Sequence, residues 1–111
     1  VEMDAAAIGN AEENVVRNDV GDCVTVIEGD ASLILPLVAP ADVIIANIIS
    51  SVLIDLLPVL DAGLAGGGHA ILSGMLFAER DMMTRTLSDS GWRIVADDHE
   101  DAWWSATIVR R

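Results

Sequence analysis

One apolar run limits the choice of fold more than any other feature of this sequence. Residues 42 to 47 read Asp-Val-Ile-Ile-Ala-Asn, without the alternation of apolar and polar side chains that marks a half-exposed strand. A strand of a parallel sheet is covered on both faces and has this continuous apolar character. The run therefore predicts a central parallel strand with a polar residue, Asn47, at its carboxyl end.

Helical and strand patterns alternate along the rest of the chain. The sequence predicts helices over residues 5–18, 31–35, 53–60 and 78–90 and buried strands over residues 24–27, 42–47 and 70–73. Pro58 should kink or restart the third helix. Gly66 to Gly68 should form a turn before the strand over residues 70–73. This alternation is typical of βαβ units, so we expect a doubly wound α/β sheet.

The end of the chain has a different pattern. Trp92, Ile94 and Ala96 alternate with polar residues, and the same alternation returns from Trp104 to Ile108. We expect these two segments to form an antiparallel hairpin, joined by the acidic connection from Asp97 to Asp101. The predicted sheet is therefore mostly parallel, with an antiparallel hairpin at its C-terminal edge.

Size and composition limit the class of protein. With 111 residues, of which 52% are hydrophobic, the chain can build one core, so we expect a single domain over residues 1–111. The net charge is −12 and all six basic residues are Arg, which disfavours direct binding to nucleic acid. An acidic surface suits a basic protein partner, and an adaptation for solubility explains it as well.

The beginning of the chain and its single cysteine bear on its origin. Cys23 alone excludes an internal disulfide, which fits a reducing compartment. No apolar run reaches the length of a membrane span and no signal-peptide pattern opens the chain, so we expect a cytoplasmic protein. Val1 to Asp4 resemble the tail of a strand, which predicts that the sequence is a fragment.

Polar residues at the carboxyl ends of the predicted strands are the candidates for ligand binding. In open α/β sheets ligands bind beyond these ends, where this chain has Glu2, Asp30, Asn47 and Ser73. Glu2 could bind a ribose diol or cap a helix, and Asp30 could bind an adenine amino group or cap the helix that follows it. The Asn47 amide could hold an amine or serve packing alone. The residues by themselves leave these alternatives open.

Other reactive side chains predict no site. His69 and His99 lack a second His, Cys or carboxylate at metal-ligand spacing, so we expect no metal. Ser73 lacks the glycine pattern of a hydrolase nucleophile. Trp103 and Trp104 are expected to be one surface and one core aromatic.

An ordered set of short motifs resembles one protein family. The motifs are Val1-Glu2-Met3-Asp4, Glu13-Asn14, Gly29-Asp30, residues 41–49, Gly67-Gly68, Leu72-Ser73-Gly74-Met75-Leu76 and the ending from Trp104 to Arg111. In this order they resemble the PrmA-type methyltransferases, which modify ribosomal protein L11. The resemblance implies a Rossmann-like class I methyltransferase sheet, the cofactor S-adenosylmethionine, and methyl transfer to amino groups of a basic ribosomal protein.

The resemblance also assigns roles to residues. The residues implied for cofactor binding are Glu2, Met3, Asp30, Ala31 and Asn47. Glu2 stands where the family usually has Asp as the ribose-binding acid, and Met3 would lie against the adenine. Asn47 and the backbone carbonyl of Ile48 would be the catalytic groups, because they would orient the amine for in-line attack on the methyl.

Parts of the family pattern would lie upstream of Val1. These are the first strand, a glycine-rich loop and an amino-terminal substrate-recognition domain, so we expect the fragment to be inactive by itself. The missing strand would leave two unpaired strand edges, which predicts self-association.

Three alternative functions remain. Asn47-Ile48-Ile49 resembles at a distance the Asn-Pro-Pro-Tyr loop of methyltransferases that act on nucleic-acid amines or on glutamine. A second alternative is a non-catalytic interaction module with the same fold. The third is a nicotinamide dehydrogenase whose glycine motif would lie upstream of Val1.

Overall fold

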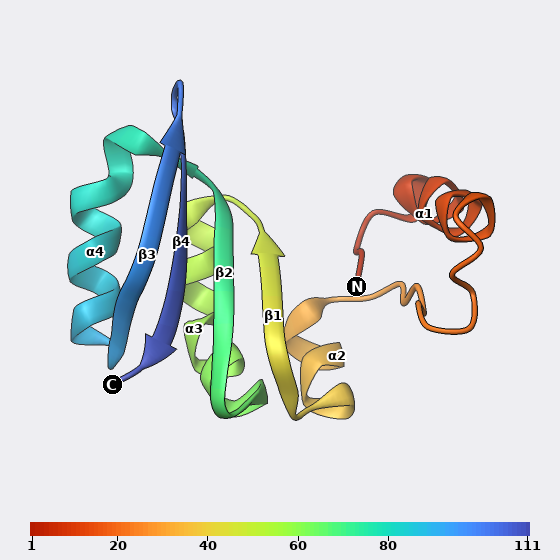
Figure 1. Cartoon of the computed structure of the whole chain (residues 1–111), viewed down its shortest axis with the longest axis horizontal. Coiled ribbons are helices and arrows are strands. Elements are labelled where there is room, and N and C mark those ends of the chain that lie inside the picture. Colours follow the sequence, from red (N-terminus) through yellow and green to blue (C-terminus); the bar gives the residue numbers. More distant parts are fainter. The chain divides into compact units, whose positions relative to one another are not determined.

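The computed structural model describes residues 1–111, which divide into two units, Val1–Leu37 and Val38–Arg111 (Figure 1). The first unit contains helix α1 (Ala5–Arg17) and most of helix α2 (Ala31–Val38). Asp4 begins α1 as its N-cap, because its Oδ1 accepts a hydrogen bond from the Ala6 N–H at 2.9 Å. None of the side chains in this unit is fully buried.

A single parallel bridge joins the two extended segments of the first unit. Glu2 pairs with Glu28, its N–H donating to the Ile27 carbonyl at 2.9 Å and its carbonyl accepting from the Gly29 N–H at 2.9 Å. The expected strand over residues 24–27 is therefore wrong as a full strand, although the parallel direction of pairing holds. Only Val1 to Met3 precede the Asp4 cap, so the partner segment in this chain is too short for a ladder.

The second unit is a four-stranded sheet with two helices. Its elements are β1 (Ala41–Asn47), α3 (Ser50–Gly63), β2 (Leu64–Leu76), a 3₁₀ turn (Phe77–Glu79), α4 (Arg80–Asp89), β3 (Trp92–Glu100) and β4 (Trp103–Arg110). The strand order is β1-β2-β4-β3, with β1 parallel to β2 and the other two pairs antiparallel. The mixed α/β sheet and the C-terminal hairpin agree with the sequence-based prediction.

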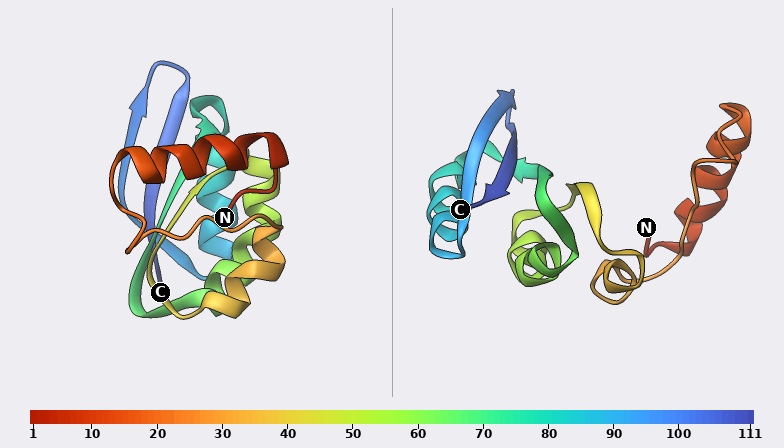
Figure 2. Two further views of the ribbon diagram at one scale, coloured as in Figure 1. Left: turned by 90° about the vertical axis from the view of Figure 1, so that its right-hand side faces the viewer. Right: turned by 60° about the horizontal axis from the view of Figure 1, so that its bottom comes forward.

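Both helices of this unit cover the same face of the sheet (Figures 1 and 2). α3 packs on β1 and β2, and α4 packs on β3. The core between the helices and the sheet consists mainly of buried apolar side chains: Leu53, Leu57, Leu60, Leu72, Met75, Met83, Leu87, Trp92, Trp104 and Ile108. Burial of this apolar area is the main force that stabilises the unit.

β1 lies at an edge of this sheet and is exposed on the face that no helix of the unit covers. Val43 and Ile45 are 54% and 71% exposed, although they pair in parallel with His69 and Ile71 on β2. The prediction of a parallel strand is confirmed, whereas its central position and its burial on both faces are not observed in this sheet. A strand with one neighbour and helices on one side cannot bury both faces.

Three local predictions about this unit differ from the structure. α3 continues through Pro58, because buried leucines on both sides of Pro58 hold the helix on the sheet. Gly66 to Gly68 form an irregularity inside β2, where Ala41 pairs with Leu64 and Val43 already pairs with His69. The acids from Asp97 to Glu100 belong to β3, and the hairpin turn consists of Asp101 and Ala102.

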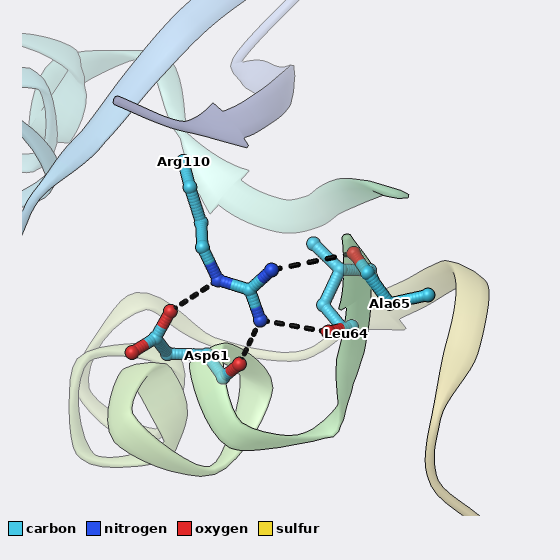
Figure 3. A network of polar contacts seen from close by, with 4 residues as sticks. All are labelled: Asp61, Leu64, Ala65 and Arg110. Atoms are coloured by element: carbon cyan, nitrogen blue, oxygen red, sulfur yellow. Dashed lines mark hydrogen bonds and ion pairs between the residues drawn. The ribbon is translucent and has the colours of Figure 1, made fainter. Parts of the chain in front are cut away.

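Arg110 joins the end of β4 to the end of α3 (Figure 3). Its Nε donates to Asp61 Oδ1 at 2.5 Å, and its guanidinium also donates to the backbone carbonyls of Asp61, Leu64 and Ala65. A cation at the carboxyl end of a helix satisfies carbonyls that have no helical partner and complements the helix dipole. Arg110 therefore fixes the connection from which β2 starts.

None of the helices combines the length and the apolar character needed to cross a membrane.

Candidate functional site

A pocket of about 590 Å³ lies at the carboxyl ends of β1 and β2. Its lining consists of Asn47–Ile49, Ser73–Gly74 and the two arms of the hairpin, Asp98–Glu100 and Trp103–Ser105. This is the edge of an α/β sheet at which ligands are expected to bind. The structure thus brings both predicted catalytic residues, Asn47 and Ile48, into one pocket.

The floor of the pocket is set by pairing between the ends of β1 and β2. Asn47 is the last residue of β1 and pairs with Ser73, and the Ile48 N–H donates to the Ser73 carbonyl at 3.0 Å. The Asn47 side chain is exposed. Its amide offers one acceptor oxygen and two donor hydrogens to a ligand.

Gly74 is a part of the floor to which the sequence-based prediction gave no role. Its φ is +80°, and a Cβ added to it would lie 2.8 Å from Asn47 Oδ1 and 2.9 Å from the Ile48 N and O atoms. Only glycine permits this close approach. A glycine inside an otherwise apolar strand pattern is a signal of such an approach, and the motif around Ser73 and Gly74 contained it.

The hairpin forms one wall of the pocket and combines acids with aromatic rings. The pairs Asp98–Ser105 and Glu100–Trp103 bring two carboxylates beside the exposed Trp103. Trp103 is 57% exposed and its neighbour Trp104 is 2% exposed, so the predicted division into a surface and a core aromatic is confirmed. The sequence-based prediction placed these acids in the connection of the hairpin and did not identify them as part of the pocket wall.

Asp97 anchors this wall to the body of the unit. Its Oδ2 accepts hydrogen bonds from Trp104 Nε1 at 2.9 Å and from Arg80 Nε at 3.1 Å. The Trp104 indole, followed by Arg80, holds the pKa of the Asp97 carboxyl below its ordinary value. The Arg80 guanidinium also lies over the Trp104 ring, 5.9 Å from its centroid. These contacts tie α4 to the hairpin.

Histidine and metal-type ligands do not gather in the chain. The His99 ring stacks on Phe77, with 4.3 Å between centroids, and His69 is exposed on β2. The structure contains no group of three or more His, Cys, Asp or Glu side chains placed to hold a metal ion.

The residues predicted to bind the nucleotide part of a cofactor lie in the first unit. Glu2 Oε1 accepts from the Asp4 N–H at 2.9 Å, so Oε2 is the carboxylate oxygen open to a ligand. Asp30 caps α2: its Oδ1 accepts from the Ser32 N–H at 2.8 Å and from Ser32 Oγ at 2.7 Å. Ser32 thereby holds the pKa of the Asp30 carboxyl below its ordinary value.

The bridge between Glu2 and Glu28 brings the ends of these two segments together within the unit. Asp30 follows Gly29, whose N–H donates to the Glu2 carbonyl. Met3 is 71% exposed, and Ala31 is the first residue of α2. Two open carboxylate oxygens and an exposed apolar side chain are groups that suit a ribose and an adenine ring.

Comparisons with known proteins match this chain to one protein family. Residues 1–111 match the family model described as "Ribosomal protein L11 methyltransferase (PrmA)". Curated relatives of that name include one from Lacticaseibacillus paracasei, 34% identical over 108 residues, and one from Symbiobacterium thermophilum, 33% identical over 111 residues. These alignments cover 97% and 100% of this chain but 33% and 35% of the relatives, so the chain spans about a third of their length.

A solved structure with a similar name also has a similar fold. The crystal structure of ribosomal protein L11 methylase from Lactobacillus delbrueckii subsp. bulgaricus superposes with a TM-score of 0.85 at 26% identity. The match covers 99% of this chain and 55% of that one.

Proposed function

The chain belongs to the ribosomal protein L11 methyltransferase (PrmA) family, and from this premise we propose that it is part of an enzyme that methylates amino groups of a ribosomal protein with S-adenosylmethionine. Because the chain spans about a third of the length of its relatives, the activity is proposed for the whole enzyme and not for this segment alone. We further propose that both units belong to one catalytic domain, since a single family model matches residues 1–111.

The observation that carries this proposal is the pocket in which Asn47, Ile48 and Gly74 meet. Bound S-adenosylmethionine would supply an electrophilic methyl group on a sulfonium. The protein's task is then to align a neutral amine with that methyl. Correct alignment of the two reacting groups lowers the activation free energy of such a reaction by a large amount. Asn47 Oδ1 and the Ile48 carbonyl are two acceptors on adjacent residues of the pocket lining. They would accept hydrogen bonds from the N–H groups of the amine and so point the lone pair of the amine at the methyl.

The remaining roles follow from the chemistry of the first unit. The open Oε2 of Glu2 would accept a hydrogen bond from a ribose hydroxyl, and the open Oδ2 of Asp30 would accept one from the adenine amino group. Met3 and Ala31 would contact the adenine ring. The charge of −12 would attract a basic ribosomal protein. A ribosomal substrate would place the reaction in the cytoplasm.

Calorimetric titration of S-adenosylhomocysteine into the whole enzyme tests the cofactor part of this proposal. We expect Glu2→Ala to weaken binding about tenfold or more, because a hydrogen bond to a charged group is lost. Glu12→Ala removes an exposed carboxylate from α1 and should leave the affinity unchanged. Absence of binding to the wild-type enzyme would contradict the proposed function, and full affinity of Glu2→Ala would contradict the role of Glu2.

A further inference from the structure

One carboxylate oxygen connects the chain that follows β1 with the chain that follows β2. Glu79 Oε2 accepts a hydrogen bond from Ser50 Oγ at 2.5 Å and another from the Leu76 N–H at 3.1 Å. Ser50 is the first residue of α3 and is 3% exposed, and Leu76 is the last residue of β2. We name this arrangement of Glu79, Ser50 and Leu76 the Glu79 clasp.

The two segments that the clasp joins are those that carry the pocket floor. Ser50 directly follows Asn47, Ile48 and Ile49, and the N-cap residue of α3, Ile49, makes no side-chain cap hydrogen bond. On the other side, Leu76 lies two residues after Gly74, the residue that approaches Asn47 Oδ1 and the Ile48 backbone. Two contacts therefore join the segment after β1 to the end of β2. One is the close approach of Gly74 to Asn47, and the other, a few residues further along both segments, is the clasp.

Local capping alone does not explain the clasp. The bond from the Leu76 N–H suffices to cap the 3₁₀ turn that starts at Phe77. The bond from Ser50 spans 29 residues of sequence and satisfies a buried hydroxyl. The Ser50 hydroxyl, followed by the Leu76 N–H, holds the pKa of the Glu79 carboxyl below its ordinary value, so Glu79 is ionised at neutral pH. A charged acceptor makes the bond stronger than one between neutral groups.

The clasp also lies close to the space in which a substrate would sit. Glu79, Ser50 and Leu76 line a second pocket of about 320 Å³. This second pocket shares Ile49, Gly74 and Trp103 with the pocket of the candidate site. A change in the clasp would thus act on the pocket floor through residues in direct contact with it.

We propose that Glu79 is a positioning residue for methyl transfer: by holding Ser50 and Leu76, it fixes the direction in which Asn47 Oδ1 and the Ile48 carbonyl face the acceptor amine. This inference rests on the proposed function and extends it. Glu79 is not part of the lining of the candidate site. It acts through the segment Asn47–Ile49. A small displacement of this segment would misalign the acceptor amine and lower the rate of methyl transfer.

A double-mutant cycle in the whole enzyme tests this role. Glu79→Ala and Ser50→Ala should each lower kcat about tenfold at unchanged affinity for S-adenosylhomocysteine, because alignment and not cofactor binding is lost. The double variant should be no slower than Glu79→Ala, since the contact with Ser50 is already lost in that variant. Glu79→Gln keeps an acceptor oxygen and should restore most of the rate. Asp81→Asn removes an exposed acid two residues away and is the matched control, with kcat unchanged.

A spectroscopic readout separates the clasp from the proposed function. Amide NMR signals of Ile48 and Ile49 should shift in Glu79→Ala and in Ser50→Ala, and should stay in place in Asp81→Asn. Unchanged signals, an additive double variant, or full kcat in Glu79→Ala would each overturn the positioning role. If the signals shift but the wild-type enzyme transfers no methyl group, the proposed function fails while the clasp as a structural link stands.

Discussion

Gly74 approaches Asn47 so closely that a side chain on residue 74 would collide with the amide: an added Cβ would lie 2.8 Å from Asn47 Oδ1. Residue 74 also has a φ of +80°, which L-residues with a side chain rarely adopt. We therefore expect Gly74→Ala to destabilise the protein by about 1–3 kcal/mol and to lower methyl transfer by the whole enzyme more than tenfold.

Gly91→Ala separates the collision from the backbone strain. Gly91 has a φ of +86° with nothing within 4 Å of an added Cβ, so its alanine variant carries the strain alone. It should lose stability in thermal unfolding but keep the rate of methyl transfer. Equal rates in the two variants would contradict the role given to the contact between Gly74 and Asn47.

Arg110 should contribute to stability through geometry as well as charge. Arg110→Lys keeps the charge but cannot reach Asp61 and the carbonyls of Leu64 and Ala65 together. We expect a loss of about 1–2 kcal/mol in the free energy of unfolding, reduced from the value of a buried contact because the guanidinium is partly exposed. Denaturant unfolding measures it. The exposed Arg93 on β3 provides the control, and an Arg93→Lys loss of equal size would sink the argument.

The contact of Asp97 with Trp104 and Arg80 predicts a dependence of stability on pH. The folded-state pKa of Asp97 is lowered, so the ionised carboxylate stabilises the folded state at every pH above the unfolded-state pKa of about 3.9. That contribution is lost as the pH falls through the lower, folded-state pKa. Asp97→Asn should therefore melt below wild type at neutral pH, and the two melting temperatures should converge in acid. A gap of constant size across this range would rule out the linkage.

The exposed face and free edge of β1 predict self-association of the 111-residue chain. Ile45 is 71% exposed on a strand that pairs on one side only within its sheet. Ile45→Lys should lower the average mass measured by light scattering at high protein concentration. Leu33→Lys changes an equally apolar, 70% exposed residue on α2 and should leave the mass unchanged. A wild-type chain that stays monomeric at all concentrations would contradict this prediction.

Periodic apolar patterns were enough to predict most elements of the fold. The leucines of α3, the pair Met83 and Leu87 of α4, and the run ending at Asn47 each form the predicted helix or strand. Local signals were less reliable where tertiary packing competes with them. Pro58 lies inside α3 because packing on the sheet outweighs the loss of one hydrogen bond.

The site was predicted in part, because strand ends can be recognised in sequence and contacts across the sheet cannot. Asn47 was identified from its position after an apolar run, and Ile48 from the family resemblance alone, and the structure places both in the pocket. The roles given to Glu2, Met3, Asp30 and Ala31 remain predictions. The bond between Ser50 and Glu79 joins residues 29 positions apart, and no periodicity in the sequence records it.

The most direct test of the proposed function is methyl transfer itself, followed by mass spectrometry of the ribosomal protein. The whole enzyme, incubated with S-adenosylmethionine and ribosomal protein L11, should add mass to L11 in steps of one methyl substitution. Asn47→Ala should lower the initial rate about one hundredfold, because an acceptor that aligns the amine is lost. Asn10→Ala, an exposed change on α1, should match wild type. An unmodified L11 with the wild-type enzyme, or an undiminished rate in Asn47→Ala, would contradict the account.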